Sequence, residues 1–508
     1  MNQDNGGIIG KLNTPTTTVA SGVWTLQDQF EAQTSSIWPL AFPQTTIANA
    51  CRFESGNSDY LDKTFSSASD ENKIFTVSTW VKKSKLGAVD SHQALISAYR
   101  SSDGLQTDVV RFPDDDTFQF YAHTTNSGTN AQLKTNRLFR DVSAWYHIVV
   151  RVDTTQSTAS NRVRIYVNGI QETSFATETY PGQNGTVVWG LGSGVSHQIG
   201  AVGNSHHYSG YLAETIYVDN QSLDATSFGI FNTVSNIWEP RAYTGTYGTN
   251  GFRLDFANSS ALGNDVSGND NDFTANNLTS VDQSTDTCSN NFATMNPIAA
   301  QGGSSASSSV VTFTEGNLVV DAISSETAIA NIGVDTGKWY WEVKVLTDQD
   351  GLAIGAANQH FDLDAELGYN SPSSPSEAKV FGYYGGNGNK FTTIGDGSQL
   401  SSYGDAIAVN DIIGVALNLD DDEVVFYKNG TAQNSGTAIS LTALGSGEQY
   451  FPAVGNWSGS AVKLSFNFGS PQFTISSGNA DANGHGNFEY AVPSGYYSLN
   501  TKNLSEFG

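Results

Sequence analysis

Two Asn-Gly pairs, each set beside a strand-like segment, constrain the fold of this chain more than any other feature. Asn168-Gly169 follows the alternating segment 162–167, and Asn429-Gly430 follows 423–428. An Asn-Gly pair favours the type I′ turn, which needs a positive φ at both central residues and joins neighbouring antiparallel strands. The sequence therefore predicts an antiparallel β-hairpin in each half of the chain, with the Asn-Gly pair at its tip.

Further segments rich in β-branched and aromatic residues occur at 74–81, 145–152 and 211–219, and again at 338–345, 412–419 and 462–469. Such residues favour strands, and the 51 glycines, with abundant Ser, Thr, Asn and Asp, favour tight turns between them. No segment is convincingly helical beyond two or three turns. A chain of 508 residues exceeds one hydrophobic core. We expect an all-β fold with two antiparallel, jelly-roll-like β-sandwiches.

Shifts in composition place the boundaries of these units. We expect an extended N-terminal arm at 1–46, a first sandwich at 47–232, a Gly/Ser/Asn-rich linker at 233–308, a second sandwich at 309–471 and a C-terminal tail at 472–508. The arm has large apolar residues but no strand pattern to bury them. We expect them to pack against a partner or a sister subunit, with folding back onto an apolar edge of the first sandwich as the alternative: Ile8, Ile9, Trp24, Leu26, Phe30, Trp38 and Phe42.

The charge balance narrows the classes of partner. Fifty acidic residues against 24 basic ones give a net charge of −26, which disfavours nucleic acid and anionic membranes. No apolar run approaches the roughly 20 residues of a membrane span, and the first residues lack the pattern of a secretory signal. Cys51 and Cys288 alone make no disulfide framework.

Two families are suggested by ordered motifs. The first half resembles the laminin-G/concanavalin-like jelly roll in FTVSTWVK from Phe75, WYHIVV from Trp145, RIYVNGI from Arg164 and GYLAETIYV from Gly210. The second half resembles a SPRY domain in KWYWEV from Lys338, IGVALNLD from Ile413, VFYKNG from Val425, YFPAV from Tyr450 and FNFG from Phe466. The first resemblance implies a lectin-like sandwich, and the second implies a bent β-sandwich that binds partners through its loops.

The combination of both domains with a GIIGK start and an FEY…PSGYYSLNTKNLSEFG end resembles structural or fibre proteins of tailed marine phages. That resemblance implies a virion protein made in the host cytoplasm and acting outside the cell. It also implies other virion proteins as partners, and a homo-oligomer, for which we expect a trimer because phage fibres are often trimeric.

The chemistry of an enzyme is not visible, and we expect no catalytic residues and no required cofactor. Glucanases of the concanavalin-like fold place acids at i, i+2 and i+4 on one strand face, whereas Glu214 and Asp219 are five residues apart. Of eight histidines only His206 and His207, near His197, cluster, and adjacent residues of a strand point to opposite faces, so we do not expect a zinc site. Asp265, Asn269, Asp270 and Asp272 are candidate calcium ligands, with ordinary turn formation as the alternative.

The candidate binding residues are aromatic side chains near expected loops, because sugar rings stack on exposed aromatic rings. They are Tyr208, Tyr383, Tyr384, Tyr403 and Trp457. The leading hypothesis is a non-enzymatic fibre, spike or capsid-decorating protein that binds host-surface glycan or a neighbouring virion protein. The alternatives are a purely architectural subunit, a bacterial surface adhesin and a glycan-degrading enzyme.

Overall fold

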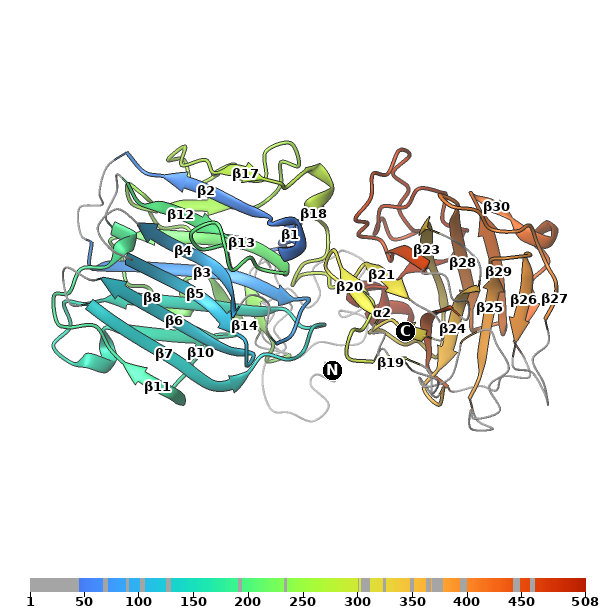
Figure 1. The fold of residues 1–508 in the computed structure, drawn as a ribbon, viewed down its shortest axis with the longest axis horizontal. Coiled ribbons are helices and arrows are strands. Elements are labelled where there is room, and N and C mark those ends of the chain that lie inside the picture. Colours follow the sequence, from blue (N-terminus) through green and yellow to red (C-terminus); the bar gives the residue numbers. More distant parts are fainter. Residues whose placement is uncertain are drawn as a thin grey trace, which may run out of the picture.

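The chain folds into two β-sandwiches that lie side by side (Figure 1), which confirms the predicted all-β class. The computed structural model describes residues 45–66, 72–87, 91–100, 106–124, 129–190, 194–232, 235–299, 301–302, 311–322, 326–347, 351–361, 367, 378–392, 400–441, 448–456 and 462–508.

The first sandwich consists of two eight-stranded sheets and a small hairpin. One sheet has the spatial order β10 (Ile170–Gln171), β9 (Val163–Val167), β8 (Tyr146–Asp153), β3 (Ile74–Lys83), β13 (Gly210–Asp219), β1 (Ala50–Phe53) and β18 (Gln283–Ser284), with β16 (Phe252–Leu254) also paired to β13. The other has the order β11 (Phe175–Thr179), β7 (Thr129–Leu138), β6 (Thr117–Thr124), β5 (Gln106–Pro113), β4 (His92–Arg100), β12 (Ser196–Ile199), β2 (Tyr60–Thr64) and β17 (Thr274–Asn276). The hairpin is β14 (Gly229–Phe231) with β15 (Trp238–Pro240).

Alternate residues of both sheets meet to form the core of this sandwich. Phe75 and Val77 of β3 face inward with Phe118 and Phe120 of β6, and all four side chains are buried. Burial of this kind contributes roughly 1.5–3 kcal/mol per large apolar side chain. A second layer covers the outer face of the sheet that contains β3, where Trp238 packs in a cluster with Trp80.

The expectation of a linker at 233–308 is wrong for most of that segment. β16, β17 and β18 extend the two sheets of the first sandwich, and Phe252, Leu254 and Phe273 are buried in its core. The Asn, Asp and Gly residues form tight turns between these short strands. The apolar residues between those turns then have enough neighbours to be buried.

The second sandwich consists of a seven-stranded and a nine-stranded sheet. The first has the order β19 (Gln301–Gly302), β22 (Glu326–Ile329), β32 (Tyr450–Asn456), β24 (Leu352–Asn358), β25 (Val380–Tyr384), β26 (Asn389–Thr392) and β27 (Ser401–Ser402). The second has the order β20 (Thr312–Thr314), β21 (Val319–Ala322), β33 (Val462–Asn467), β23 (Lys338–Thr347), β28 (Ile412–Asn418), β29 (Glu423–Lys428) and β30 (Thr431–Ala432), with β31 (Ile439–Ser440) on β29 and β34 (Tyr497–Ser498) on β23.

Both predicted Asn-Gly hairpins are confirmed. Asn168-Gly169 turns β9 into β10 with φ of 47° and 79°, and Asn429-Gly430 turns β29 into β30 with φ of 49° and 77°. Both strand pairs are antiparallel. The positive φ at both positions of each turn is the geometry that this residue pair favours.

The segment predicted as a tail at 472–508 packs closely on the second sandwich. The Glu342 carboxylate, fully buried on β23, accepts hydrogen bonds from the backbone N–H groups of Glu489 and Tyr490. The carboxylate of Asp481 accepts bonds from the Ser498 N–H and hydroxyl. The segment ends in α2 (Thr501–Phe507), capped by the Asn500 side chain. Among the described residues, no helix has the length and apolar character needed to cross a bilayer.

Candidate functional site

The structure places four of the five predicted binding aromatics inside the cores. The exposed fraction is 0% for Tyr208 and Tyr383, 8% for Tyr384 and 5% for Tyr403. A sugar ring stacks on an aromatic face that is open to solvent, so the expectation for these four residues is wrong. Trp457 lies outside the described residues, as do all seven apolar residues singled out in the arm.

The reason for this burial is visible in their contacts. Tyr383 stacks on Phe426 with ring centroids 5.4 Å apart and lies edge-on to Tyr403 at 5.9 Å. The Tyr208 hydroxyl donates to the Lys82 carbonyl at 2.6 Å. Tyr208 and Tyr383 therefore fill core volume while their hydroxyls donate to backbone carbonyls inside the protein, that of Tyr383 to Asp405.

The candidate calcium ligands form a hydrogen-bonded turn. Both Asp265 carboxylate oxygens accept bonds from the protein, Oδ1 from Arg253 N–H and Oδ2 from Asn271 N–H. Asp272 Oδ1 accepts the Asp265 N–H, and the Asn269 amide donates to backbone carbonyls. Within the part of the chain that the structure describes, no group of three His, Cys, Asp or Glu side chains is arranged to hold a metal ion.

The two acids of β13 are engaged separately. Glu214 forms a two-pronged ion pair with Arg253, with Oε1 2.6 Å from Nε, and burial raises the pKa of its carboxyl group. Asp219 Oδ2 accepts the Asn250 N–H at 3.2 Å. Each carboxylate thus has its own structural partner on a different segment.

The three clustered histidines also separate. His197 is buried against Trp189, and burial lowers its pKa to about 4. His206 stacks on His92 with ring centroids 3.9 Å apart, and His207 lies 5.7 Å from the Tyr60 ring. This arrangement does not resemble a zinc site, in which several imidazole nitrogens converge on one point.

A shallow polar hollow of about 390 Å³ on the outer face of the first sandwich is a candidate binding site, because tyrosine rings line it together with a carboxylate and an amide. Its floor is β12, which pairs with β2 on one side and β4 on the other, and these three strands lie side by side in the left-hand sandwich of Figure 1. The lining side chains come from these strands and from two adjoining turns: Tyr60, Asp62, Thr64, Tyr99, Arg100, Gly194, Ser196, Gly203 and Asn204.

Strand alternation explains why these side chains share one face. Tyr60, Asp62 and Thr64 occupy every second position of β2, whereas Leu61 between them is buried in the core. Tyr99 lies across from Ser196, which in turn pairs with Thr64. The hollow therefore has a rigid sheet beneath it and a tyrosine on each flanking strand.

The polar groups of this hollow are held in place by one another. Asp62 Oδ1 accepts the Ser196 hydroxyl at 2.5 Å and the Gln198 amide at 3.3 Å. The Asn204 N–H donates to Gln198 Oε1 at 3.1 Å, and the Gln198 amide donates to Asn204 Oδ1. Partly exposed rings beside oriented carboxylate and amide groups can bind a polyhydroxylated ligand by stacking and hydrogen bonding.

This hollow was not predicted from the sequence, because exposed aromatic residues were expected in loops and not within strands. The available signal was the alternation in Tyr60-Leu61-Asp62-Lys63-Thr64, which puts an aromatic, an acid and a hydroxyl on one face. No local pattern shows that this strand lies near Tyr99 or Asn204, because both residues are at least 35 positions away along the chain and are brought close only through β12.

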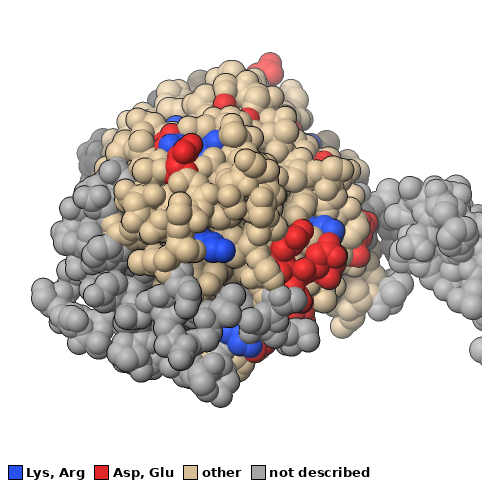
Figure 2. Space-filling model, turned by 90° about the vertical axis from the view of Figure 1, so that its right-hand side faces the viewer, with Lys and Arg blue, Asp and Glu red and all other residues tan. Residues whose placement is uncertain are grey.

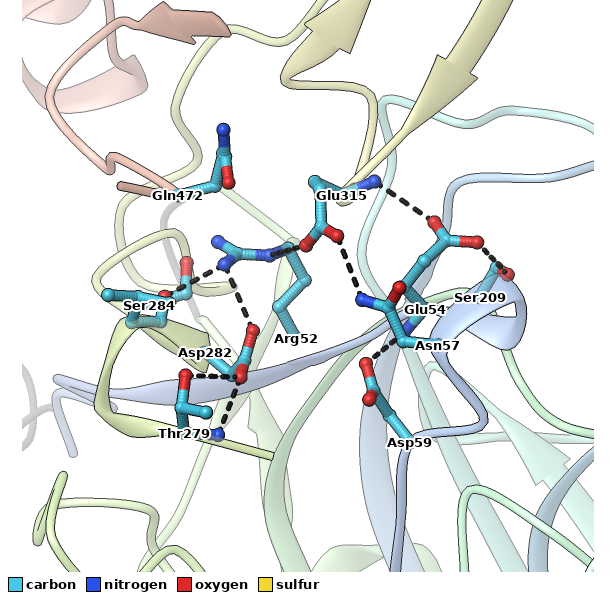
Figure 3. A network of polar contacts seen from close by, with 12 residues as sticks. Arg52, Glu54, Asn57, Asp59, Ser209, Thr279, Asp282, Ser284, Glu315 and Gln472 are labelled. Atoms are coloured by element: carbon cyan, nitrogen blue, oxygen red, sulfur yellow. Dashed lines mark hydrogen bonds and ion pairs between the residues drawn. The ribbon is translucent and has the colours of Figure 1, made fainter. Parts of the chain in front are cut away.

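The junction of the two sandwiches is a second polar site (Figure 3). The β20–β21 turn of the second sandwich contacts a socket on the first sandwich, which Arg52, Glu54 and Tyr211 form. There the Glu315 N–H donates to Glu54 Oε2 at 2.9 Å, and the Tyr211 hydroxyl donates to the Gly316 carbonyl at 2.9 Å. Arg52, which is fully buried, pairs with Asp282 at 3.1 Å and with Glu315 at 3.4 Å. The turn and its socket connect the sandwiches through charged groups.

This junction contains more acids than bases. Lys85 pairs with Glu54, and Asp59 Oδ2 accepts the Glu54 N–H at 2.9 Å. Asp59 is 1% exposed, and its Oδ1 has no hydrogen-bond partner among the residues that the structure describes. Burial, together with the nearby acids Asp282, Glu315 and Glu54, raises the pKa of Asp59 to about 7 against a lowering by the Glu54 N–H.

The far end of the second sandwich differs from the junction. Figure 2 shows that most of its described surface carries neither basic nor acidic side chains, and that the acidic ones gather mainly in one group. On this face the described acidic side chains are therefore grouped rather than evenly spaced.

Two family models match this chain. The model of the concanavalin A-like lectin/glucanases superfamily matches residues 55–218, and the SPRY domain model matches residues 338–471. Both matches fall on the sandwiches described above, and each covers less than half of the chain.

Among curated proteins, the chain is 32% identical over 146 residues to the ATP-dependent RNA helicase Ddx1 of Drosophila melanogaster, covering 28% of this chain and 17% of the helicase. It is 30% identical over 141 residues to Ran-binding protein 9 of Xenopus laevis, covering 27% of this chain and 23% of that protein. The chain thus spans less than a quarter of the length of these relatives.

Among solved structures, the SPRY domain of human HERC1 is 15% identical, covering 34% of this chain and 96% of that domain, with a TM-score of 0.26. The SAP-like pentraxin of Limulus polyphemus is also 15% identical, covering 35% of this chain and 79% of the pentraxin, with the same TM-score. From the two family matches, this chain contains a concanavalin A-like/laminin-G jelly-roll domain followed by a SPRY domain.

Proposed function

We propose that this protein is a non-enzymatic virion protein of a tailed phage (a fibre, spike or capsid decoration) that binds a host-surface glycan through its jelly-roll domain. The observation that carries the glycan assignment is the hollow between Tyr60 and Tyr99. Its rings are partly exposed, and Asp62 and Asn204 present oxygen and nitrogen atoms beside them. A rigid sheet floor orients these groups before the ligand arrives, which lowers the entropy cost of binding.

A glycan array probed with the full chain tests this assignment. We expect binding to a restricted set of glycans, and a loss of at least about fivefold in affinity in a Tyr60→Ala/Tyr99→Ala chain, from the loss of two ring contacts. A separate Asp62→Asn chain should also bind the glycan more weakly, because it lacks a charged hydrogen-bond acceptor. Retention of full affinity in both chains would reject the hollow as the site.

The virion role is supported by the resemblance of both chain termini to phage structural proteins and by the junction. A binding protein on a particle needs its modules connected to one another, and the ion pairs around Arg52 supply such a connection. The weakly charged end of the SPRY domain suits contact with a neighbouring virion protein. We propose a homo-oligomer, with a trimer as the expected state.

Labelling of native particles with an antibody against this chain, observed by electron microscopy, tests the virion role. We expect label at one defined position on the particle. Particles without label would contradict it. A labelled particle together with an empty glycan array would favour the second candidate, a purely architectural subunit, for which the buried junction is the favouring observation.

A further inference from the structure

The junction between the two domains contains a buried acid, Asp59, that forms no ion pair with the described residues. Asp59 follows the 3-10 turn η2 (Ser55–Asn57), whose Asn57 amide donates to Glu315 Oε1 at 2.9 Å across the junction. Asp59 holds this turn through its bond to the Glu54 N–H, and its second carboxylate oxygen is buried without a partner in the described part of the chain. A negative charge on this oxygen would therefore lie in a poorly solvated place.

The ionisable surroundings of Asp59 are mostly acidic. Glu54 comes from the same segment, Asp282 from the 3-10 turn η6 (Ser280–Asp282), and Glu315 from the second sandwich. The cations described at the junction are already paired: Arg52 with Asp282 and Glu315, Lys85 with Glu54, and Lys82, which lies over the Tyr211 ring, with Asp286. The remaining titratable groups here are the Cys51 thiol and the Tyr211 hydroxyl, whose pKa values burial raises well above the ordinary range. Neither of these groups ionises near neutral pH, whereas Asp59, with a pKa of about 7, changes charge there.

We propose that Asp59 makes the coupling of the jelly-roll and SPRY domains dependent on pH: the junction is tight while Asp59 holds its proton and loosens when Asp59 ionises. The charged carboxylate would repel Glu315, which belongs to the other domain, and would favour movement of the η2 turn toward water. This device regulates how firmly the domains are held and does not depend on glycan binding.

The direction of the effect follows from proton linkage. Asp59 has a pKa of about 7 in the closed junction, against roughly 3.9 for a solvated Asp. The closed state thus binds more protons than an open one between these values, so closure is favoured at low pH, weakens as pH rises from about 4 to 7, and changes little more above about 8. For one proton, the opening equilibrium constant should rise about three- to tenfold between pH 6 and pH 8, the upper value applying when opening fully solvates the carboxylate.

Hydrogen–deuterium exchange of the Glu315 amide measures this opening directly, because that N–H donates to Glu54 across the junction. The full chain is followed between pH 6 and pH 8, with rates corrected for the pH dependence of chemical exchange. Peptides from β23, in the core of the SPRY domain, serve as the internal reference. Asp59→Asn keeps the acceptor for the Glu54 N–H but cannot ionise, and Asp270→Asn makes the same charge change on an exposed loop.

We expect the wild-type chain and Asp270→Asn to show the three- to tenfold rise, and Asp59→Asn to change by less than about twofold. An equal rise in Asp59→Asn, or no rise in the wild-type chain, would overturn the proposal. Should Asp59→Asn fail to fold, Glu315→Gln replaces it: removal of the facing carboxylate must move the midpoint of the wild-type transition to lower pH, and an unmoved midpoint would equally overturn it.

Discussion

Gly316, at the tip of the β20–β21 turn, should be the most sensitive small residue of the domain junction. Its φ is +67°, and a Cβ built on it would lie 2.1 Å from the hydroxyl oxygen of Tyr211. Tyr211 cannot retreat easily, because it is 1% exposed and its ring packs against Trp145 and the Lys82 ammonium. Gly316→Ala must therefore displace the turn from its socket.

The magnitude has two parts. A left-handed backbone costs an alanine roughly 1 kcal/mol, and the clash, with loss of the Tyr211 hydrogen bond to the Gly316 carbonyl, adds about 1–3 kcal/mol. We expect Gly316→Ala to lower the free energy of unfolding by roughly 2–4 kcal/mol in urea denaturation. Gly484→Ala is the matched control, because Gly484 has a φ of +75° and no described atom lies within 4 Å of its Cβ position. This substitution should lower the free energy of unfolding only by the backbone cost of roughly 1 kcal/mol.

Equal losses of unfolding free energy in the two alanine chains would refute the reasoning, since the control lacks the steric part. The hydrogen exchange of the Glu315 amide gives a second check. It should accelerate in Gly316→Ala and stay unchanged in Gly484→Ala. Acceleration in neither chain would mean that the turn tolerates the added methyl group without leaving its socket.

Three further predictions concern two buried carboxyl groups and the N-terminal arm. Burial raises the pKa of Asp108 to about 7. The free energy of unfolding of Asp108→Asn should therefore match that of the wild-type chain near pH 4 and exceed it by roughly 2–4 kcal/mol at pH 8. A difference that stays constant in urea denaturations at several pH values would count against this. Asp481→Ala, which leaves the Ser498 N–H and hydroxyl unpaired, should cost about 3 kcal/mol and make the C-terminal segment sensitive to proteolysis, whereas uncut protein would contradict it. A chain beginning at Ile47 should stay folded but no longer oligomerise or enter particles, as measured by light scattering and by particle assembly; normal assembly would show that the arm is not the attachment segment.

The fold was predictable from the sequence because its signals are local. Alternation along β9 and β29, followed by Asn-Gly, specifies a hairpin from a dozen residues. The same local method misjudged 233–308, where short strands such as β16 are stabilised by pairing with β13 about 40 residues away. A three-residue strand between turn residues has too weak a pattern to be distinguished from a linker.

The candidate site was less predictable because exposure is a tertiary property. Tyr383 and Tyr403 stand near glycine-rich sequence that indicates loops, yet they pack on Phe426 in the core. Tyr60 and Tyr99 lie within strands and remain partly exposed, because the sheet that carries them has one face toward solvent. Only the strand order β4, β12, β2 brings these two tyrosines to one hollow.

The affinity of the best glycan from the array, compared between Tyr99→Ala and Tyr121→Ala chains, tests the central claim most directly. Both tyrosines are partly buried against the same small cluster on the outer face of the jelly roll, but only Tyr99 lines the hollow. By calorimetric titration we expect the dissociation constant to rise about fivefold or more in Tyr99→Ala and to stay within about twofold of the wild-type value in Tyr121→Ala. Equal dissociation constants in all three chains, or a larger loss in Tyr121→Ala, would contradict the account.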